Sequence, residues 1–82
     1  MGLLTRYLAA AMNLARYEIL ADDGTFYGEI PGLDGVLANA PTLEHCREEL
    51  REVLEGWIVL GLLLGHRIPE LDDINLNIAV PG

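Results

Sequence analysis

Carboxylates are the most numerous side chains in this chain that could do chemistry, with thirteen Asp and Glu against five Arg and no lysine. A metal-dependent nuclease needs several carboxylates that converge on one site from different strands. The acidic residues that could be imagined as such ligands are Asp22, Asp23, Glu29, Asp34, Asp72 and Asp73. Most of them fall in expected turns, where aspartate is common because it bonds to its own backbone. The pattern favours a protein that is not an enzyme and has no metal or cofactor site.

Nucleophilic chemistry would have to use Cys46, the only cysteine. A catalytic thiol needs a nearby base, and the neighbouring His45 projects from a different part of the predicted helix. His45 and His66 lie near the two ends of that helix, which suits a solvent-facing side chain and a partner of the C-terminal helix dipole. We therefore expect a buried structural thiol at Cys46 and no disulfide within the chain.

The helix that positions these residues is predicted over 42–65. Thr42 is a good N-cap, Gly65 can adopt the left-handed conformation that ends a helix, and Arg51 and Glu55 are spaced for an ion pair. In its first half, apolar residues recur at spacings of three and four, which places them on one face. They are Leu43, Cys46, Leu50, Val53, Leu54, Trp57 and Ile58.

The second half of the helix, 56–65, carries no charge and is apolar on all sides. It is shorter than the roughly 20 residues that cross a bilayer, so protein must cover it. A preceding amphipathic helix over 3–15 offers a partial cover; its polar face lacks the basic character of a membrane-surface helix. We expect a homo-oligomer, a dimer or a tetramer, with Trp57, Leu60 and Leu64 at the contact.

Four strands complete the predicted fold. Residues 16–21 and 25–30 form an antiparallel hairpin across an Asp-Asp-Gly turn, and 36–39 form a short third strand. Apolar residues alternate with polar ones over 74–80, which predicts a last strand after the long helix. The fold class is α+β in the order α-β-β-β-α-β, a small antiparallel-rich sheet with helices on one face, as a single domain over 1–82.

The net charge is −8, and the five arginines are scattered. Binding to nucleic acid depends mostly on clustered Lys and Arg, so a direct nucleic-acid contact is not expected. An acidic surface suits a basic protein partner instead. The N-terminus lacks the layout of a signal peptide, and we expect a cytoplasmic protein with no membrane contact.

Three segments in a fixed order resemble the HicB-like antitoxin family. They are a Pro-Gly turn over 30–36, a Thr-Leu-Glu helix start over 42–46, and a Gly-x-x-Ile-Pro exit over 65–69. Asp34 stands where the family usually has a second proline, and Pro41 precedes the helix where glycine or aspartate is common. The resemblance is greatest to small stand-alone HicB-like proteins; many larger members continue into a DNA-binding domain, which we do not expect here.

The resemblance implies a sandwich like that of double-stranded-RNA-binding domains, and neutralisation of a basic, mRNA-cleaving HicA-type toxin by protein–protein binding. The acidic residues that we expect at this contact are Asp22 and Asp23 in the hairpin turn and Glu44, Glu48 and Glu52 on the helix. The family core has been likened to part of a ribonuclease H fold, so a nuclease remnant is a minor alternative. The main alternative is a structural or regulatory homo-oligomer with no toxin partner.

Overall fold

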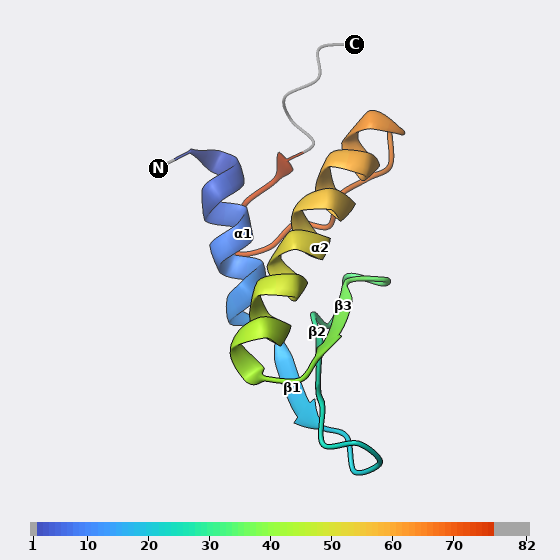
Figure 1. Ribbon diagram of the computed structural model, residues 1–82. Helices are drawn as coiled ribbons and strands as arrows, with labels where there is room; N and C mark the ends of the chain where they lie inside the picture. Colours follow the sequence, from blue (N-terminus) through green and yellow to red (C-terminus); the bar gives the residue numbers. More distant parts are fainter. Residues whose placement is uncertain (1, 77–82) are drawn as a thin grey trace.

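The computed structural model describes residues 2–76 and confirms an α+β fold. Within these residues the elements follow the order α1 (Leu3–Asn13), β1 (Arg16–Ile19), β2 (Phe26–Glu29), β3 (Leu37–Ala40) and α2 (Leu43–Leu63). Figure 1 shows α1 and α2 side by side, with the sheet beside the N-terminal half of α2. The expected hairpin and third strand are confirmed, and the third strand is shifted by one residue.

The three strands of the described region form an antiparallel sheet in the order β1-β2-β3. In its register Tyr17 is opposite Gly28, and Gly28 is opposite Ala38. The face that meets α2 is therefore built from small side chains on β2 and β3, so the helix can lie close to the backbone. A Cβ atom at Gly28 would be 2.9 Å from the Tyr17 ring and 3.1 Å from Cys46 Sγ. Glycine at this position is what lets the tyrosine ring cover the sheet.

Helix α2 begins and ends as its sequence predicts. The Thr42 hydroxyl accepts a hydrogen bond of 3.1 Å from the His45 amide, and Gly65 adopts a φ of +74°. The Arg51–Glu55 ion pair forms at 3.5 Å. The residues that α2 buries are Cys46, Leu50, Leu54, Ile58 and Gly61. Leu43 and Val53, expected on the same face, are exposed, because the buried row is narrower than the apolar pattern.

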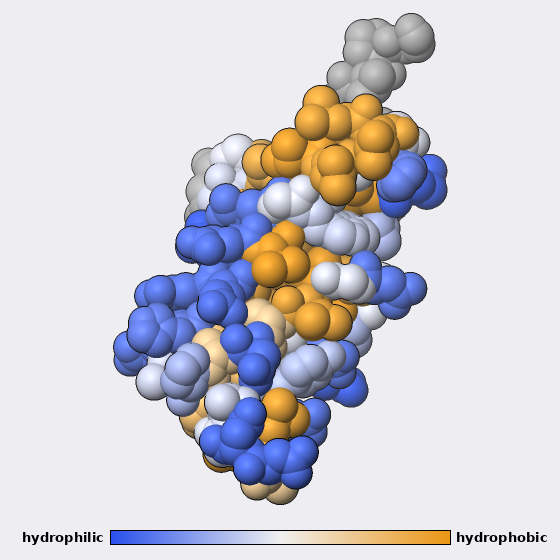
Figure 2. Space-filling model, turned by 45° about the vertical axis from the view of Figure 1, so that its right-hand side comes forward, coloured by the Kyte–Doolittle hydropathy of each residue, from blue (hydrophilic) through white to orange (hydrophobic). Residues whose placement is uncertain are grey.

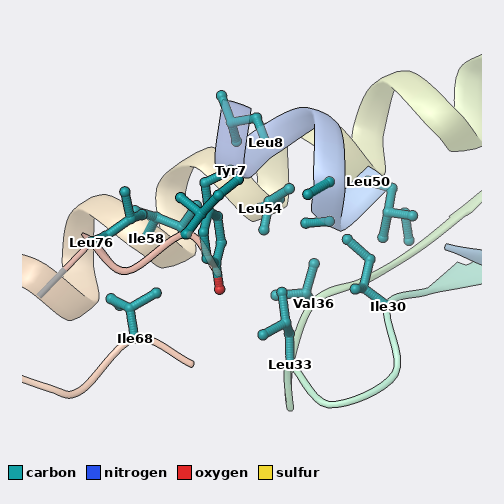
Figure 3. Packing of buried hydrophobic residues seen from close by; sticks show 14 of the residues in the cluster. Tyr7, Leu8, Ile30, Leu33, Val36, Leu50, Leu54, Ile58, Ile68 and Leu76 are labelled. Atoms are coloured by element: carbon teal, nitrogen blue, oxygen red, sulfur yellow. The ribbon is translucent and has the colours of Figure 1, made fainter. Parts of the chain in front are cut away.

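Helix α1 packs beside α2 and completes the core. Figure 3 shows Tyr7 among Leu54 and Ile58 of α2, with Ile68 from the segment after α2 close by. The Tyr7 hydroxyl donates a hydrogen bond of 2.6 Å to the carbonyl oxygen of Pro69. Only the middle of the predicted apolar stripe of this helix is buried, and its first turn is not: Leu3 and Leu4 are exposed.

The predicted strand over 74–80 lies largely outside the described residues, which end at Leu76. In the described part, Leu71 and Ile74 form an isolated antiparallel bridge across a turn at Asp72 and Asp73. Ile74 and Leu76 are buried in the core cluster. Their contribution in this part of the chain is apolar packing against the helices.

Candidate partner-binding surfaces

The hairpin turn holds the first pair of acidic residues expected at a partner contact. Asp23 Oδ1 accepts hydrogen bonds from the Thr25 amide at 3.0 Å and from the Thr25 hydroxyl at 2.7 Å. These two hydrogen bonds, that of the hydroxyl first, lower the pKa of the Asp23 carboxyl. Asp23 therefore stabilises its own turn, while Asp22 is exposed beside it.

The three glutamates of α2 that we expected at the contact, Glu44, Glu48 and Glu52, follow one another at four-residue spacing, and the structure separates them into two groups. Glu44 and Glu48 line a groove between α1 and α2 with a volume of about 510 Å³. Glu52, one turn further, is exposed and is not among the residues that line the groove.

The groove combines an apolar wall with charged side chains. Leu8, Ala9 and Met12 of α1 supply the wall, and Arg47 and Arg51 of α2 lie among the glutamates. Arg51 also faces Glu55 on its other side, through the ion pair described above. The sequence did not indicate this groove, because it depends on how far apart α1 and α2 pack. The only signal in the sequence was the alternation of Glu and Arg at spacings of three and four.

The hairpin turn and the groove lie toward the same end of the molecule, on different elements. Figure 1 shows the turn between β1 and β2 at the end where α2 begins. The expected acidic residues are thus divided between two elements, with Asp22 and Asp23 on the turn and Glu44 and Glu48 in the groove.

The opposite end of α2 carries a second surface, which is apolar. We call it the leucine surface, and it consists of exposed side chains in the last turns of α2: Val59 (52% exposed), Leu60 (57%), Leu62 (40%), Leu63 (78%) and Leu64 (59%). Figure 2 shows hydrophobic side chains gathered at this end of the molecule. Leu60 and Leu64 thus lie where a second chain could reach them.

Trp57 lies one turn before Leu60 on α2 and, unlike the members of the leucine surface, makes a polar contact within the chain. Its side chain is half-buried, and its indole Nε1 donates a hydrogen bond of 3.1 Å to the carbonyl oxygen of Asp34, in the loop between β2 and β3. The indole is therefore fixed by a contact within the chain. The sequence could not indicate this, because 23 residues separate donor and acceptor.

The remaining chemical side chains are placed as expected. Cys46 is fully buried, with its Sγ atom 3.7 Å from the Ala38 carbonyl oxygen, and burial raises the pKa of its thiol. His45 is exposed in the first turn of α2, and His66 is exposed after its end. Among residues 2–76, no group of three His, Cys, Asp or Glu side chains is arranged to hold a metal ion. No helix in this part of the chain is long and apolar enough to span a membrane.

The chain is similar to known proteins of one family. The UPF0150-like family matches residues 6–69. A UPF0150 protein of Synechocystis sp., ssl0259, is 38% identical over 50 residues, which cover 61% of this chain and 68% of that protein. The crystal structure of TTHA0281 from Thermus thermophilus is similar over 100% of this chain and 99% of that one, with 42% identity and a TM-score of 0.86.

Proposed function

Because the chain belongs to the UPF0150-like family and carries a net charge of −8, we propose that it is a HicB-like antitoxin module. In this role it neutralises a basic HicA-type mRNA-cleaving toxin by protein–protein binding, with no catalytic group and no cofactor of its own. The observation that carries the proposal is the groove between α1 and α2, where Glu44 and Glu48 border an apolar wall.

The groove suits a segment that carries both apolar and charged side chains, because Arg47 and Arg51 line it together with the two glutamates and the apolar wall. Leu8 and Met12 can accept an apolar side chain, while the carboxylates of Glu44 and Glu48 can pair with Lys or Arg of the partner. The net charge of −8 adds long-range attraction, which speeds encounter with a positively charged surface. A ribonuclease toxin binds RNA phosphates through such a surface, so an acidic protein competes for the same contacts.

The distribution of carboxylates supports a binding role over a nuclease role. Asp23 is engaged in its turn, and Asp22, Asp34 and Asp72 lie in separate loops. A two-metal nuclease would need such carboxylates to face one another across a few ångströms. The same acidic surface disfavours direct binding to nucleic acid.

The proposal is tested by co-expression with a HicA-type toxin and by surface plasmon resonance of the purified pair at several salt concentrations. Replacing Glu44, Glu48 and Glu52 together by Gln should slow association and reduce its salt dependence. The matched control replaces Glu18, Glu29 and Glu70 by Gln, an equal change in net charge at other exposed positions. Equal losses in the two triple variants would show that net charge alone acts and that the groove is not the contact. Absence of any rescue or binding would reject the antitoxin role.

A second candidate function, a regulatory homo-oligomer with no toxin partner, is favoured by the leucine surface. This surface has no charge with which to attract a basic toxin. The neighbouring reading frame distinguishes the two functions: a short, basic, His-containing protein encoded there favours the antitoxin role.

A further inference from the structure

Gly56 occupies a position in α2 that nothing within the described chain explains. It is exposed, and a Cβ atom built there would meet nothing within 4 Å. Glycine inside a helix costs about 1 kcal/mol relative to alanine, and its missing side chain leaves room for another group to approach closely. The other glycine of the helix, Gly61, has such a group beside it, since its Cβ would be 2.8 Å from Ile68 Cδ1.

The position of Gly56 on the helix connects it to the leucine surface. Gly56, Leu60 and Leu63 follow one another at spacings of four and three, so they form one row along α2. The buried row, which includes Leu54, Ile58 and Gly61, lies on the opposite side. The row thus points away from the rest of the described chain, with a gap at Gly56 and a projecting side chain at Leu63, which is 78% exposed.

We infer that this row is the contact between two copies of the chain, with their α2 helices antiparallel. In a symmetric antiparallel pair centred near Leu60, Leu63 of each copy lies over Gly56 of the other. The gap in one row then receives the projecting side chain of the partner copy, as a knob enters a hole between packed helices. The row is complementary to itself only in this orientation. In a symmetric parallel pair, Gly56 of one copy would lie opposite Gly56 of the other, and the projecting Leu63 side chains would also meet.

The charges of α2 favour the same orientation. The first half of the helix is net negative, with five glutamates against Arg47 and Arg51, while 56–65 carries no charge. A parallel pair would bring the two acidic halves together, and an antiparallel pair directs them to opposite ends. The groove between α1 and α2 therefore stays open to solvent in the dimer.

The area available is sufficient for a weak but specific dimer. The exposed fractions of the five leucine-surface side chains set an upper bound of about 1,000 Å² buried by two copies together, which is the lower limit for a specific interface. Since the contact is apolar and each copy carries a charge of −8, added salt should strengthen the dimer by screening repulsion. Binding of a basic toxin should respond in the opposite direction, so the two proposals are separable.

The test is the mass of the full chain by sedimentation equilibrium, with variants that leave the fold intact. The wild type should approach twice 9.0 kDa at micromolar to millimolar concentration. In the single chain, the new side chain of Gly56→Leu points into open space. In the dimer it occupies the place of Leu63 from the other copy, so the dissociation constant of the dimer should rise at least about tenfold. Leu63→Glu should give a monomer. Leu37→Glu, at an exposed residue of β3, is the control and should leave the dimer unchanged.

Disulfide cross-linking then tests the orientation. Oxidation of a mixture of Gly56→Cys and Leu63→Cys chains should give a cross-linked pair, whereas Gly56→Cys alone should not cross-link to itself. The buried Cys46 does not take part in the folded protein. The inference is overturned by a wild type that stays monomeric at millimolar concentration, by unchanged association of Gly56→Leu, or by Gly56→Cys chains that cross-link to each other.

Discussion

The hydroxyl of Tyr7 lies 2.6 Å from the carbonyl oxygen of Pro69, so a single hydrogen bond joins residues that are 62 positions apart. Tyr7 belongs to α1, and Pro69 follows α2. The aromatic ring is fully buried, and burial raises the pKa of its hydroxyl. The tyrosine thus combines apolar packing with a polar contact at the edge of the core.

Tyr7→Phe should therefore destabilise the protein, because the Pro69 carbonyl loses its donor while the ring packing is kept. The expected decrease in the free energy of unfolding is about 1 kcal/mol. Urea denaturation followed by circular dichroism measures it. An unchanged midpoint would mean that water replaces the hydroxyl at no cost.

Tyr17→Phe makes the same chemical change but should affect the free energy of unfolding in the opposite direction. The Tyr17 hydroxyl oxygen is buried and has no hydrogen-bond partner. Removing an unsatisfied buried polar atom should raise the free energy of unfolding by about 1 kcal/mol. The two variants are best compared in one denaturation series, and a loss of stability in Tyr17→Phe would reveal a hydrogen bond to water at this site.

Alanine substitutions at the two glycines of α2 should also have opposite effects on stability. Gly56→Ala gains helix propensity in open space and should stabilise by about 1 kcal/mol. Gly61→Ala gains the same propensity but presses on the buried Ile68 side chain, an overpacking that costs about 1–3 kcal/mol. Both are measured in a Leu63→Glu background, so that association does not contribute. Equal effects would show that Ile68 moves aside freely.

Stability should decrease at alkaline pH because burial raises the pKa of the Cys46 thiol above its ordinary value of 9.0. As pH rises, the thiol of the unfolded chain loses its proton before the thiol of the folded chain does. This deprotonation stabilises the unfolded state relative to the folded state and lowers the free energy of unfolding. Stability is therefore full below pH 9.0 and falls above it, and the buried Tyr7 adds a further decrease above its ordinary value of 10.0. Urea midpoints across this range measure the slope. Cys46→Ala should lower stability at every pH and flatten the curve between the two values.

Local features of the sequence predicted much of the fold. Thr42 caps α2, Gly65 ends it, and Gly24 forms the hairpin turn, because each depends on the chemistry of a few adjacent residues. The exposure of Leu43 and Val53 was not predictable. It depends on the width of the contact between α2 and a sheet whose small residues, such as Ala38, become significant only when paired.

The candidate surfaces were predictable to different extents. The absence of charge in the second half of α2 indicated an apolar surface, and Leu60 and Leu64 are indeed exposed. Trp57 has the same apolar character but is held by the Asp34 carbonyl, a contact that only the folded chain creates. The groove beside Glu44 and Glu48 also required the structure, since its wall comes from α1.

The weak attachment of α1 has a consequence for motion. The helix lacks a side-chain N-cap, acidic residues in its first turn and basic residues in its last turn. It is held mainly by its packing on α2 and by the Tyr7 hydroxyl. Its amides should therefore exchange with solvent through an opening that leaves the sheet and α2 intact. Because α1 forms one wall of the groove, the groove exists only while α1 is closed, and a molecule that binds there would slow exchange throughout the helix.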